Sequence, residues 1–285
     1  MIEHLNELEM RALLDLVSVA ESLKIPLMLV GANARRLAFD IPFGFPSPRT
    51  TEDWDFAARM PNWDVFARIY QQAVDGPFRP GDSAHRIIHK DTGILVDLVP
   101  FGPLTGTHEK IHWPQSQQVM SVLGFEDACD SCVHEKLPNG MEIGIVTPSL
   151  LAVLKMIAYA ERGEQFPRDL QDLWFIMERY ARPPAHENRA FDELVEHFPD
   201  DETYYEHLDS LLLGWDIGRK CRPMTLAAIQ PIIKELSSEE SPRIEALLSR
   251  TGDEEDREVQ RRKITSEFGW LQTGIALATT ASLTL

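Results

Sequence analysis

Cysteine is scarce in this sequence, with three residues in a chain of 285. Three thiols are too few for the disulfide framework of a small secreted protein, so a reducing compartment is indicated and we expect a cytoplasmic location. Residues 1–4 lack the basic and apolar segments of a signal peptide. Residues 268–285 carry no charge, but they are too short and too rich in polar side chains to predict a membrane span. We therefore expect no membrane partner and a docked or frayed C-terminal tail.

Positive charge is also scarce. The chain has 28 Lys and Arg residues against 45 Asp and Glu residues, a formal net charge of −17. Binding of nucleic acid through a broad surface needs clustered Lys and Arg, because the release of counterions from phosphates drives it. The composition argues against such a surface and leaves room only for a local basic groove. The acidic excess of residues 235–256 is typical of a solvated face, and we assign it no function.

Hydrophobic spacing divides the chain into two parts with different secondary structure. Helices are expected at residues 3–24, 33–38 and 61–73, and strands at residues 27–30, 50–57, 85–89, 94–99, 129–134 and 141–146. Thr147 and Pro148 are a typical N-cap and first-turn proline, and nearly everything after them has helical spacing. The expected fold class is α+β, with a mixed-sheet domain of residues 1–146 followed by a mainly helical domain of residues 147–285.

Three aspartates form the candidate site. Asp53 and Asp55 alternate with apolar residues on one expected strand, so their side chains share a face, roughly 6.5–7 Å apart. Two ionised carboxylates this close repel each other unless a cation lies between them. Asp97 lies in an otherwise apolar strand, where a lone charge is costly to bury unless it is paired or binds a metal. The three residues predict a metal site that a pair of Mg²⁺ ions would fit. The simpler alternative is that Asp53 and Asp55 face solvent and Asp97 caps a turn.

Gly31 directly follows an expected buried strand and precedes a helix. A glycine there lets backbone amides approach phosphate oxygens, and a helix N-terminus favours anions. The segments 29–34, 49–56 and 96–101, which contain Gly31 and the three aspartates, resemble in order and spacing the motifs of polymerase-β-type nucleotidyltransferases. The fold that this resemblance implies is a nucleotidyltransferase-type N-terminal domain.

Within that superfamily, the chain most resembles the AbiEii-like toxin family. That family carries a glycine–helix motif, then R-x-T-x-D-x-D-F, a K-x-x-A helix and an R/K-D-x-x-D-L helix. Residues 155–158 and 168–173 match the two later helices, so the resemblance covers about residues 27–175.

The resemblance implies a role for each matching residue. Asp53, Asp55 and Asp97 would hold Mg²⁺, or Mn²⁺ in its place, and Asp97 could accept the proton of the attacking hydroxyl. Lys155 would contact the triphosphate, and Asp172 would orient that lysine or the nucleotide. The positions expected at the nucleotide are Gly31, Ala32, Asn33, Arg49 and Arg168.

The activity implied is metal-dependent transfer of a nucleoside monophosphate from ATP or another nucleoside triphosphate to a hydroxyl. The acceptor would be an RNA 3′ end such as that of tRNA, a protein or a small molecule. The toxin relatives imply a toxin–antitoxin system, with a cognate antitoxin as a partner.

A second interpretation stays open. Ala32 stands where superfamily members usually carry Ser or Thr, whose hydroxyl binds phosphate, although Asn33 could donate instead. The chain could therefore be a catalytically impaired binding or antitoxin-like module with the same fold. Lys155 and Asp172 could likewise be charges on the outer faces of amphipathic helices.

Two shorter motifs carry less weight. Residues 108–112 match the H-E-x-x-H signature of zinc proteases, but Pro103 and Pro114 leave little room for the helix that it requires. Cys129 and Cys132, with His134 beyond them, form half of a zinc site, and we expect them to be packing residues.

Overall fold

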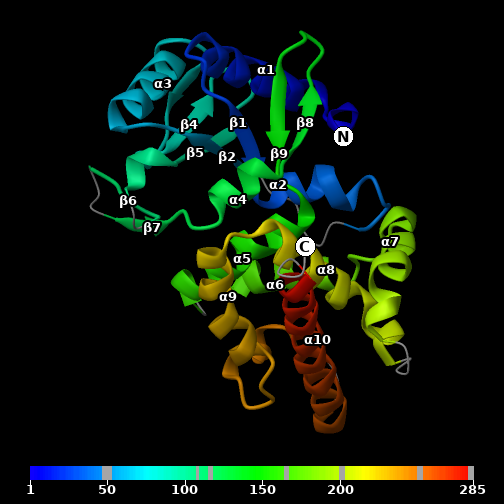
Figure 1. Ribbon diagram of the computed structural model, residues 1–285. Helices are drawn as coiled ribbons and strands as arrows, with labels where there is room; N and C mark the ends of the chain where they lie inside the picture. The colour runs from blue at the N-terminus through cyan, green and yellow to red at the C-terminus, as the bar shows by residue number, and fades with distance from the viewer. Residues whose placement is uncertain are drawn as a thin grey trace. The chain divides into compact units, whose positions relative to one another are not determined.

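The computed structural model of the protein describes residues 1–46, 53–106, 109–114, 118–163, 167–198, 203–248 and 253–281 (Figure 1). The chain divides into two compact units, Met1–Leu151 and Ala152–Leu285. The strands lie in the first unit, and every regular element described in the second is a helix. The α+β class predicted from the sequence is therefore confirmed.

The first unit is built on a mixed sheet. Among the described residues, seven strands form it, in the order β3-β4-β5-β2-β1-β9-β8. Their bounds are β1 Leu27–Val30, β2 Asp53–Arg59, β3 Phe78–Pro80, β4 Arg86–His89, β5 Leu95–Phe101, β8 Val133–Lys136 and β9 Glu142–Ile145. Strand β2 runs antiparallel to β1 and parallel to β5, and β1 runs parallel to β9. The mixed character of the sheet, predicted from the sequence, is thus confirmed.

Burial explains why the central strands form where they do. All four residues of β1 are buried, as expected for an apolar strand in the middle of a sheet. Strand β2 alternates: Trp54 and Phe56 are buried on one face, while Asp53 and Asp55 are half-buried on the other. The alternation fixes which residues of β2 can meet a ligand.

Helices α1 (Glu7–Ser22) and α3 (Trp63–Asp75) belong to the same unit and pack against each other (Figure 1). Asn6 caps α1 in a capping box with Glu9, and Asn62 caps α3. Helix α2 (Gly31–Arg35) begins directly after β1 and continues into a π-helical turn, Arg36–Asp40. A second, two-stranded sheet joins β6 (Lys110–His112) and β7 (Val119–Ser121).

The strand expected at residues 129–134 was wrong over its first half. Residues Phe125–Asp130 form helix α4, and β8 begins only at Val133. Two buried side chains, Phe125 and Ala128, lie on one face of this helix, and acidic residues in its first turn favour a helix N-terminus. The short strands β3, β6 and β7 were not predicted, because three residues are too few to show a period.

The second unit consists of helices. They are α5 Pro148–Arg162, which begins in the first unit, α6 Pro167–Met177, α7 Pro184–Leu194, α8 Leu208–Lys220, α9 Pro223–Leu236 and α10 Glu254–Ala281. Short 3-10 helices cover Ile2–His4, Pro103–Thr105, Val195–His197, Thr203–His207 and Pro242–Ala246. Within the described residues, no helix has the combination of length and apolar character that crossing a membrane requires.

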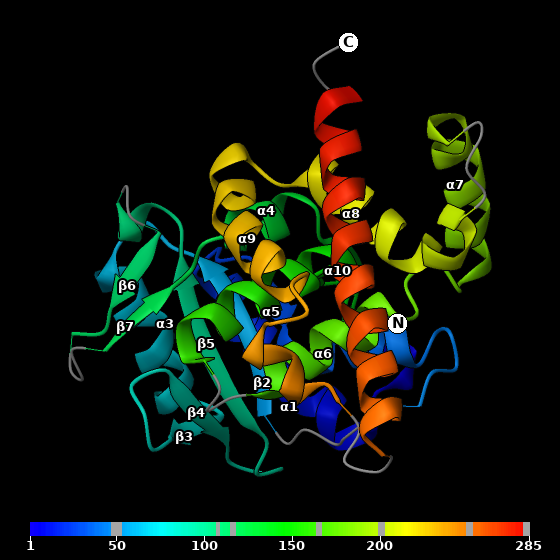
Figure 2. The ribbon, with the colours of Figure 1, turned by 90° about the horizontal axis from the view of Figure 1, so that it is seen from below.

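Helices α8 and α10 lie side by side with their backbones in contact (Figure 2). A Cβ on Gly214 would overlap the carbonyl oxygen of Leu271, and a Cβ on Gly274 would overlap that of Leu211. Glycine is therefore needed on both helices for this close approach. Residues 268–281 of the uncharged segment are part of α10, and Phe268, Leu271 and Ile275 are buried.

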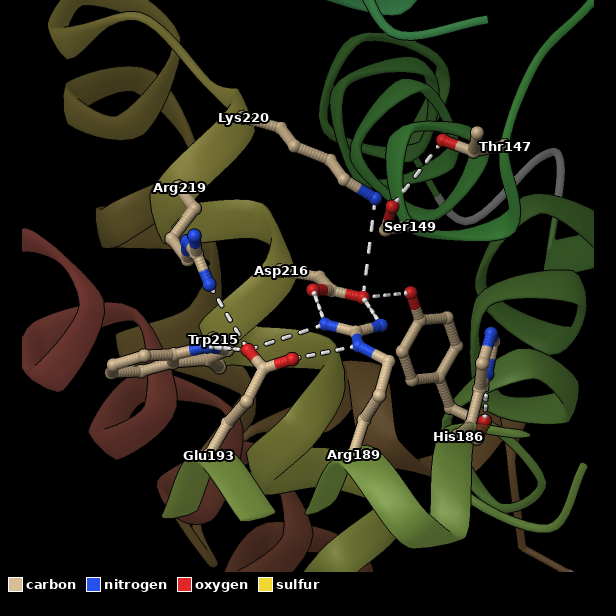
Figure 3. A network of polar contacts seen from close by, with 10 residues as sticks. Thr147, Ser149, His186, Arg189, Glu193, Trp215, Asp216, Arg219 and Lys220 are labelled. Atoms are coloured by element: carbon tan, nitrogen blue, oxygen red, sulfur yellow. Dashed lines mark hydrogen bonds and ion pairs between the residues drawn. The ribbon is translucent and has the colours of Figure 1, made fainter. Parts of the chain in front are cut away.

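A network of polar side chains joins α7 to α8 (Figure 3). Arg189 donates two hydrogen bonds to Asp216, at 2.7 and 3.1 Å, and two to Glu193, at 2.8 and 3.5 Å. The Tyr180 hydroxyl donates to Asp216 at 2.5 Å, and the Trp215 indole donates to Glu193 at 2.8 Å. Only 4% of the Asp216 side chain is exposed, so these partners compensate a buried charge.

Candidate functional site

Two of the predicted aspartates, Asp55 and Asp97, lie in one row across the sheet. Asp55 on β2 pairs with Asp97 on β5 and with Val30 on β1, and Asp97 also pairs with Arg86 on β4. Residues paired across neighbouring strands point to the same face of a sheet. Asp53 lies two residues before Asp55 and shares that face. The structure therefore places the three predicted carboxylates on one face of the sheet and adds an arginine to that face.

Arg86 holds the carboxylate of Asp97. Its Nε donates to Oδ1 and its second terminal nitrogen to Oδ2, both at 2.7 Å, which is the bidentate geometry of a strong arginine–carboxylate pair. Asp53 lies 3.6 Å and Asp82 3.7 Å from the same guanidinium. The hydrogen bonds to Asp97 raise the pKa of Arg86, although burial acts against them. The charge that the sequence places in an apolar strand is therefore compensated by an arginine.

A tight turn positions Arg86. The stem of its side chain crosses Gly81, where a Cβ would lie 2.5 Å from Cγ of Arg86. The Gly81 amide donates to the Arg86 carbonyl at 2.9 Å, and the Tyr70 hydroxyl donates to the same oxygen at 3.3 Å. A side chain at position 81 would therefore collide with the Arg86 side chain, and glycine leaves room for it.

Gly31 supports Asp55. Its φ of +71° is in the left-handed region that favours glycine, and a Cβ at this position would overlap Oδ2 of Asp55. The sequence predicted that this glycine would let backbone approach a phosphate. In the structure the same freedom brings the backbone against a carboxylate.

Asn33 is engaged within the protein. Its Nδ2 donates to the carbonyl oxygen of Asp53 at 2.9 Å, and its Oδ1 accepts from Nε of Arg36 at 3.0 Å. Arg36 in turn lies 2.7 Å from Glu9 of α1. This buried amide therefore ties the start of β2 to α2. Ala32, the neighbouring position of the motif, is half-buried.

The later residues of the resemblance form a cluster in the second unit. Lys155 on α5 lies 3.0 Å from Asp169 and 2.8 Å from Asp172, both on α6. Arg162 lies 2.9 Å from the other oxygen of Asp169. Both aspartates are buried, so they need these cations. The resemblance implied that Asp172 orients Lys155 or the nucleotide, and the structure adds Asp169 as a second partner of this lysine.

Two further candidates are Arg168 and Arg49. Arg168 is exposed on the first turn of α6. Arg49 lies outside the described residues, as does His108 of the H-E-x-x-H motif. The rest of that motif lies in or beside strand β6, so the helix that a zinc protease needs is not formed there.

Within the described ranges, no three or more His, Cys, Asp or Glu side chains are arranged so that they could hold a metal ion. Cys132 Sγ lies 3.9 Å from His134 Nε2, and burial raises the pKa of the Cys129 and Cys132 thiols. Both cysteines are free. A raised pKa keeps both thiols protonated, which suits packing residues better than metal ligands, since a ligand must be a thiolate.

Arg86 is the residue of the site that the sequence did not reveal. An arginine at the start of a hairpin strand is an ordinary feature of a sequence. Its importance follows from the antiparallel register that sets it opposite Asp97. The separate prediction of the two strands at 85–89 and 94–99 was correct but did not fix that register.

No family model and no curated protein matches the chain. Among solved structures it is similar to an antigenic nucleotidyltransferase-like protein from Paracoccidioides brasiliensis, with 16% identity and a TM-score of 0.39, over 72% of this chain and 94% of that one. It is also similar to the CdnE cyclic dinucleotide synthase of Elizabethkingia meningoseptica, with 9% identity and a TM-score of 0.29, over 92% and 91% of the two chains.

Proposed function

We propose that this protein is a metal-dependent nucleotidyltransferase that moves a nucleoside monophosphate from a nucleoside triphosphate to an acceptor hydroxyl. The observation that carries the proposal is the register of Asp55 and Asp97, side by side on β2 and β5, with Asp53 on the same face. The order of motifs in the sequence, which resembles that of the AbiEii-like family, gives this cluster its proposed chemistry.

Carboxylate oxygens, which these three residues offer, are the kind of donor atom that Mg²⁺ and Mn²⁺ prefer. Mg²⁺ prefers oxygen ligands and is usually held by one or two carboxylates together with substrate phosphates, so a complete cage of protein ligands is not required. Asp53, whose side chain is 42% exposed, and Asp55 would hold the ion, and Asp97 would join them. The bound ion would neutralise negative charge on the phosphate oxygens.

The remaining roles belong to the chain's own side chains. Lys155 would bind the triphosphate, since an ammonium group has three donors and Asp169 and Asp172 account for two. Asp172 would keep this lysine in place. Asp97 would accept the proton of the attacking hydroxyl. For this, Arg86 must release at least one of the two carboxylate oxygens of Asp97.

We propose three chemical classes of acceptor. An RNA 3′ end such as that of tRNA, a protein side chain and a small molecule each offer the hydroxyl that the reaction needs. A toxin role with a cognate antitoxin follows from the resemblance and belongs to the same proposal. A net charge of −17 means that an RNA acceptor would be held by a local basic groove.

Label transfer tests the proposal. The protein is incubated with Mg²⁺ and each α-labelled nucleoside triphosphate in turn, with total cell RNA, lysate protein or the small-molecule fraction as acceptor. We expect one nucleotide to label one fraction, and the Asp55→Asn variant to give no label. Label that persists in that variant would contradict the assignment of the site.

A binding module is the rival function, and two observations favour it. Ala32 supplies no hydroxyl, and Arg86 occupies both oxygens of Asp97. This rival predicts nucleotide binding, measured by calorimetry, without label transfer to any of the three fractions. Pyrophosphate release that depends on Asp55 would exclude it.

A further inference from the structure

Arg86 and a metal ion would compete for Asp97. The guanidinium takes both carboxylate oxygens in a bidentate pair, and the same group lies 3.6 Å from Asp53. A divalent cation bound through Asp97 needs at least one of those oxygens. While Arg86 stays in place, it supplies the positive charge that a metal would otherwise supply.

The position of Arg86 is built by the fold. Its stem lies across Gly81, its carbonyl accepts hydrogen bonds from the Gly81 amide and the Tyr70 hydroxyl, and Asp82 lies 3.7 Å from its guanidinium. Three carboxylates therefore surround one cation. Its side chain is nonetheless 23% exposed, so an incoming anion can reach it.

Phosphate is the anion best suited to draw Arg86 away. Guanidinium groups bind phosphate in the same bidentate manner in which they bind carboxylate. A triphosphate held beside Asp53 and Asp55 would place negative charge next to Arg86 and compete with Asp97 for it.

We propose that Arg86 is a gate that couples nucleotide binding to metal binding. This inference rests on the proposed metal site at Asp53, Asp55 and Asp97. Without nucleotide, Arg86 blocks Asp97 and weakens the metal site. When a nucleoside triphosphate binds, Arg86 transfers to its phosphates and Asp97 becomes a ligand. Coupling of this kind is reciprocal, so the metal strengthens nucleotide binding by the same factor.

The test measures Mn²⁺ binding by electron paramagnetic resonance and calorimetry, with and without a non-hydrolysable analogue of each nucleoside triphosphate. In the native protein we expect the correct analogue to tighten Mn²⁺ binding about tenfold, within the roughly 5–150-fold range of such couplings. In Arg86→Gln, Mn²⁺ binding without nucleotide should already be about tenfold tighter, and the analogue should tighten it little further.

Two further variants keep the result interpretable. Arg86→Lys retains a positive charge but loses the bidentate geometry, so its Mn²⁺ affinity without nucleotide should lie between those of the native protein and Arg86→Gln. Arg79→Gln removes an exposed arginine from the neighbouring strand β3 and should behave as the native protein does.

Unchanged or weaker Mn²⁺ binding in both Arg86 variants would overturn the gate. The metal site itself is judged separately with Asp53→Ala. If the native protein binds Mn²⁺ and Asp53→Ala does not, the proposed site stands whatever the Arg86 variants show. If neither the native protein nor Arg86→Gln binds Mn²⁺, the metal site and the gate both fail.

Discussion

The backbone of Gly31 lies directly against the carboxylate of Asp55. A Cβ at Gly31 would overlap Oδ2 of Asp55, and the φ of +71° already disfavours other residues. Strand β1 and strand β2 are antiparallel neighbours, with Val30 opposite Asp55. The end of one strand and the first turn of a helix therefore fix the position of the Asp55 carboxylate.

Gly31→Ala should damage the site more than the fold. The left-handed φ costs about 1–2 kcal/mol for a residue with a Cβ, and the overlap displaces Asp55 in addition. We expect loss of Mn²⁺ binding together with a lower free energy of unfolding, measured by calorimetry and urea denaturation.

Gly93→Ala is the matched control. Gly93 has a φ of +75°, but in the part of the chain that the structure describes no atom lies within 4 Å of its Cβ position. It should lose about 1 kcal/mol of stability through φ alone and keep Mn²⁺ binding. Equal effects of the two variants on Mn²⁺ binding would show that the contact with Asp55 is unimportant.

Asp172→Asn should weaken nucleotide binding without changing Mn²⁺ binding. Lys155 would keep Asp169 as a partner but lose the carboxylate at 2.8 Å that helps to hold it. We expect the dissociation constant of the nucleotide to rise about tenfold, which corresponds to about 1.4 kcal/mol. Asp192→Asn, an exposed residue of α7, serves as the charge control. An unchanged nucleotide affinity would assign Lys155 and Asp172 a purely structural role.

Arg189→Met should destabilise the second unit. Asp216 would remain buried without its bidentate partner, and breaking a buried pair usually costs 3–5 kcal/mol. Since the Arg189 side chain is 35% exposed, we expect about 2–4 kcal/mol in urea denaturation. Arg262→Gln removes an exposed partner of Glu258 and should change little. If Arg189→Met lowers the free energy of unfolding as little as that control does, then Tyr180 and Lys220, which lies 3.9 Å from Asp216, are enough to compensate the buried charge.

The same network predicts acid sensitivity. Burial lowers the pKa of His186. Burial acts to raise the pKa of Asp216, but Arg189, Lys220 and Tyr180 outweigh it, so that this pKa is also lowered. A lowered pKa in the folded state means that the unfolded state binds more protons, so stability is lost as the pH falls.

The free energy of unfolding should therefore decline first below pH 6.5, the ordinary pKa of a histidine such as His186. It should decline again below about 4, where the carboxylate of Asp216 takes up a proton in the unfolded chain but stays ionised in the folded protein. Urea denaturation between pH 8 and 3 measures both steps. His186→Asn should remove the first step only. A profile that stays flat between pH 7 and 5 in the native protein would contradict the His186 assignment.

Substitution by alanine should change the stability of the protein in opposite directions at two glycines of α10. Gly274→Ala inserts a Cβ into the backbone of α8, and overpacking of this kind costs about 1–3 kcal/mol or more. Gly269 lies in the same helix, and no described atom outside its own helix lies within 4 Å of its Cβ position. Gly269→Ala should add about 0.5–1 kcal/mol, because alanine favours the helix. Thermal unfolding of the two variants measures the contrast, which would vanish if α8 and α10 were loosely packed.

Local patterns predicted the parts of the fold that local physics determines. The apolar run of β1, the alternation of β2 and the Thr147–Pro148 start of α5 each follow from burial or capping. Residues 129–134 misled the prediction, because a six-residue helix shows less than two turns of its period.

Site residues could be predicted where they belong to a motif in the sequence. They could not be predicted where their role depends on a contact with a residue on another strand. Asp53, Asp55 and Asp97 stand out by their spacing and by the apolar surroundings of Asp97. The engagement of Asn33 with the Asp53 carbonyl and of Arg86 with Asp97 depends on the register of strands distant in the chain. Register of that kind is set by the packing of the whole sheet.

The close contact of α8 with α10 also bears on synthesis at the ribosome. Gly214 is made about sixty residues before Gly274, a delay of roughly 3–12 s at ordinary rates of translation. During that interval the glycine face of α8 has no partner from α10. The strands of the first unit, by contrast, have all been made by Ile145. The sheet can therefore assemble while the chain is still growing, whereas the helical unit completes its core only after α10 has emerged.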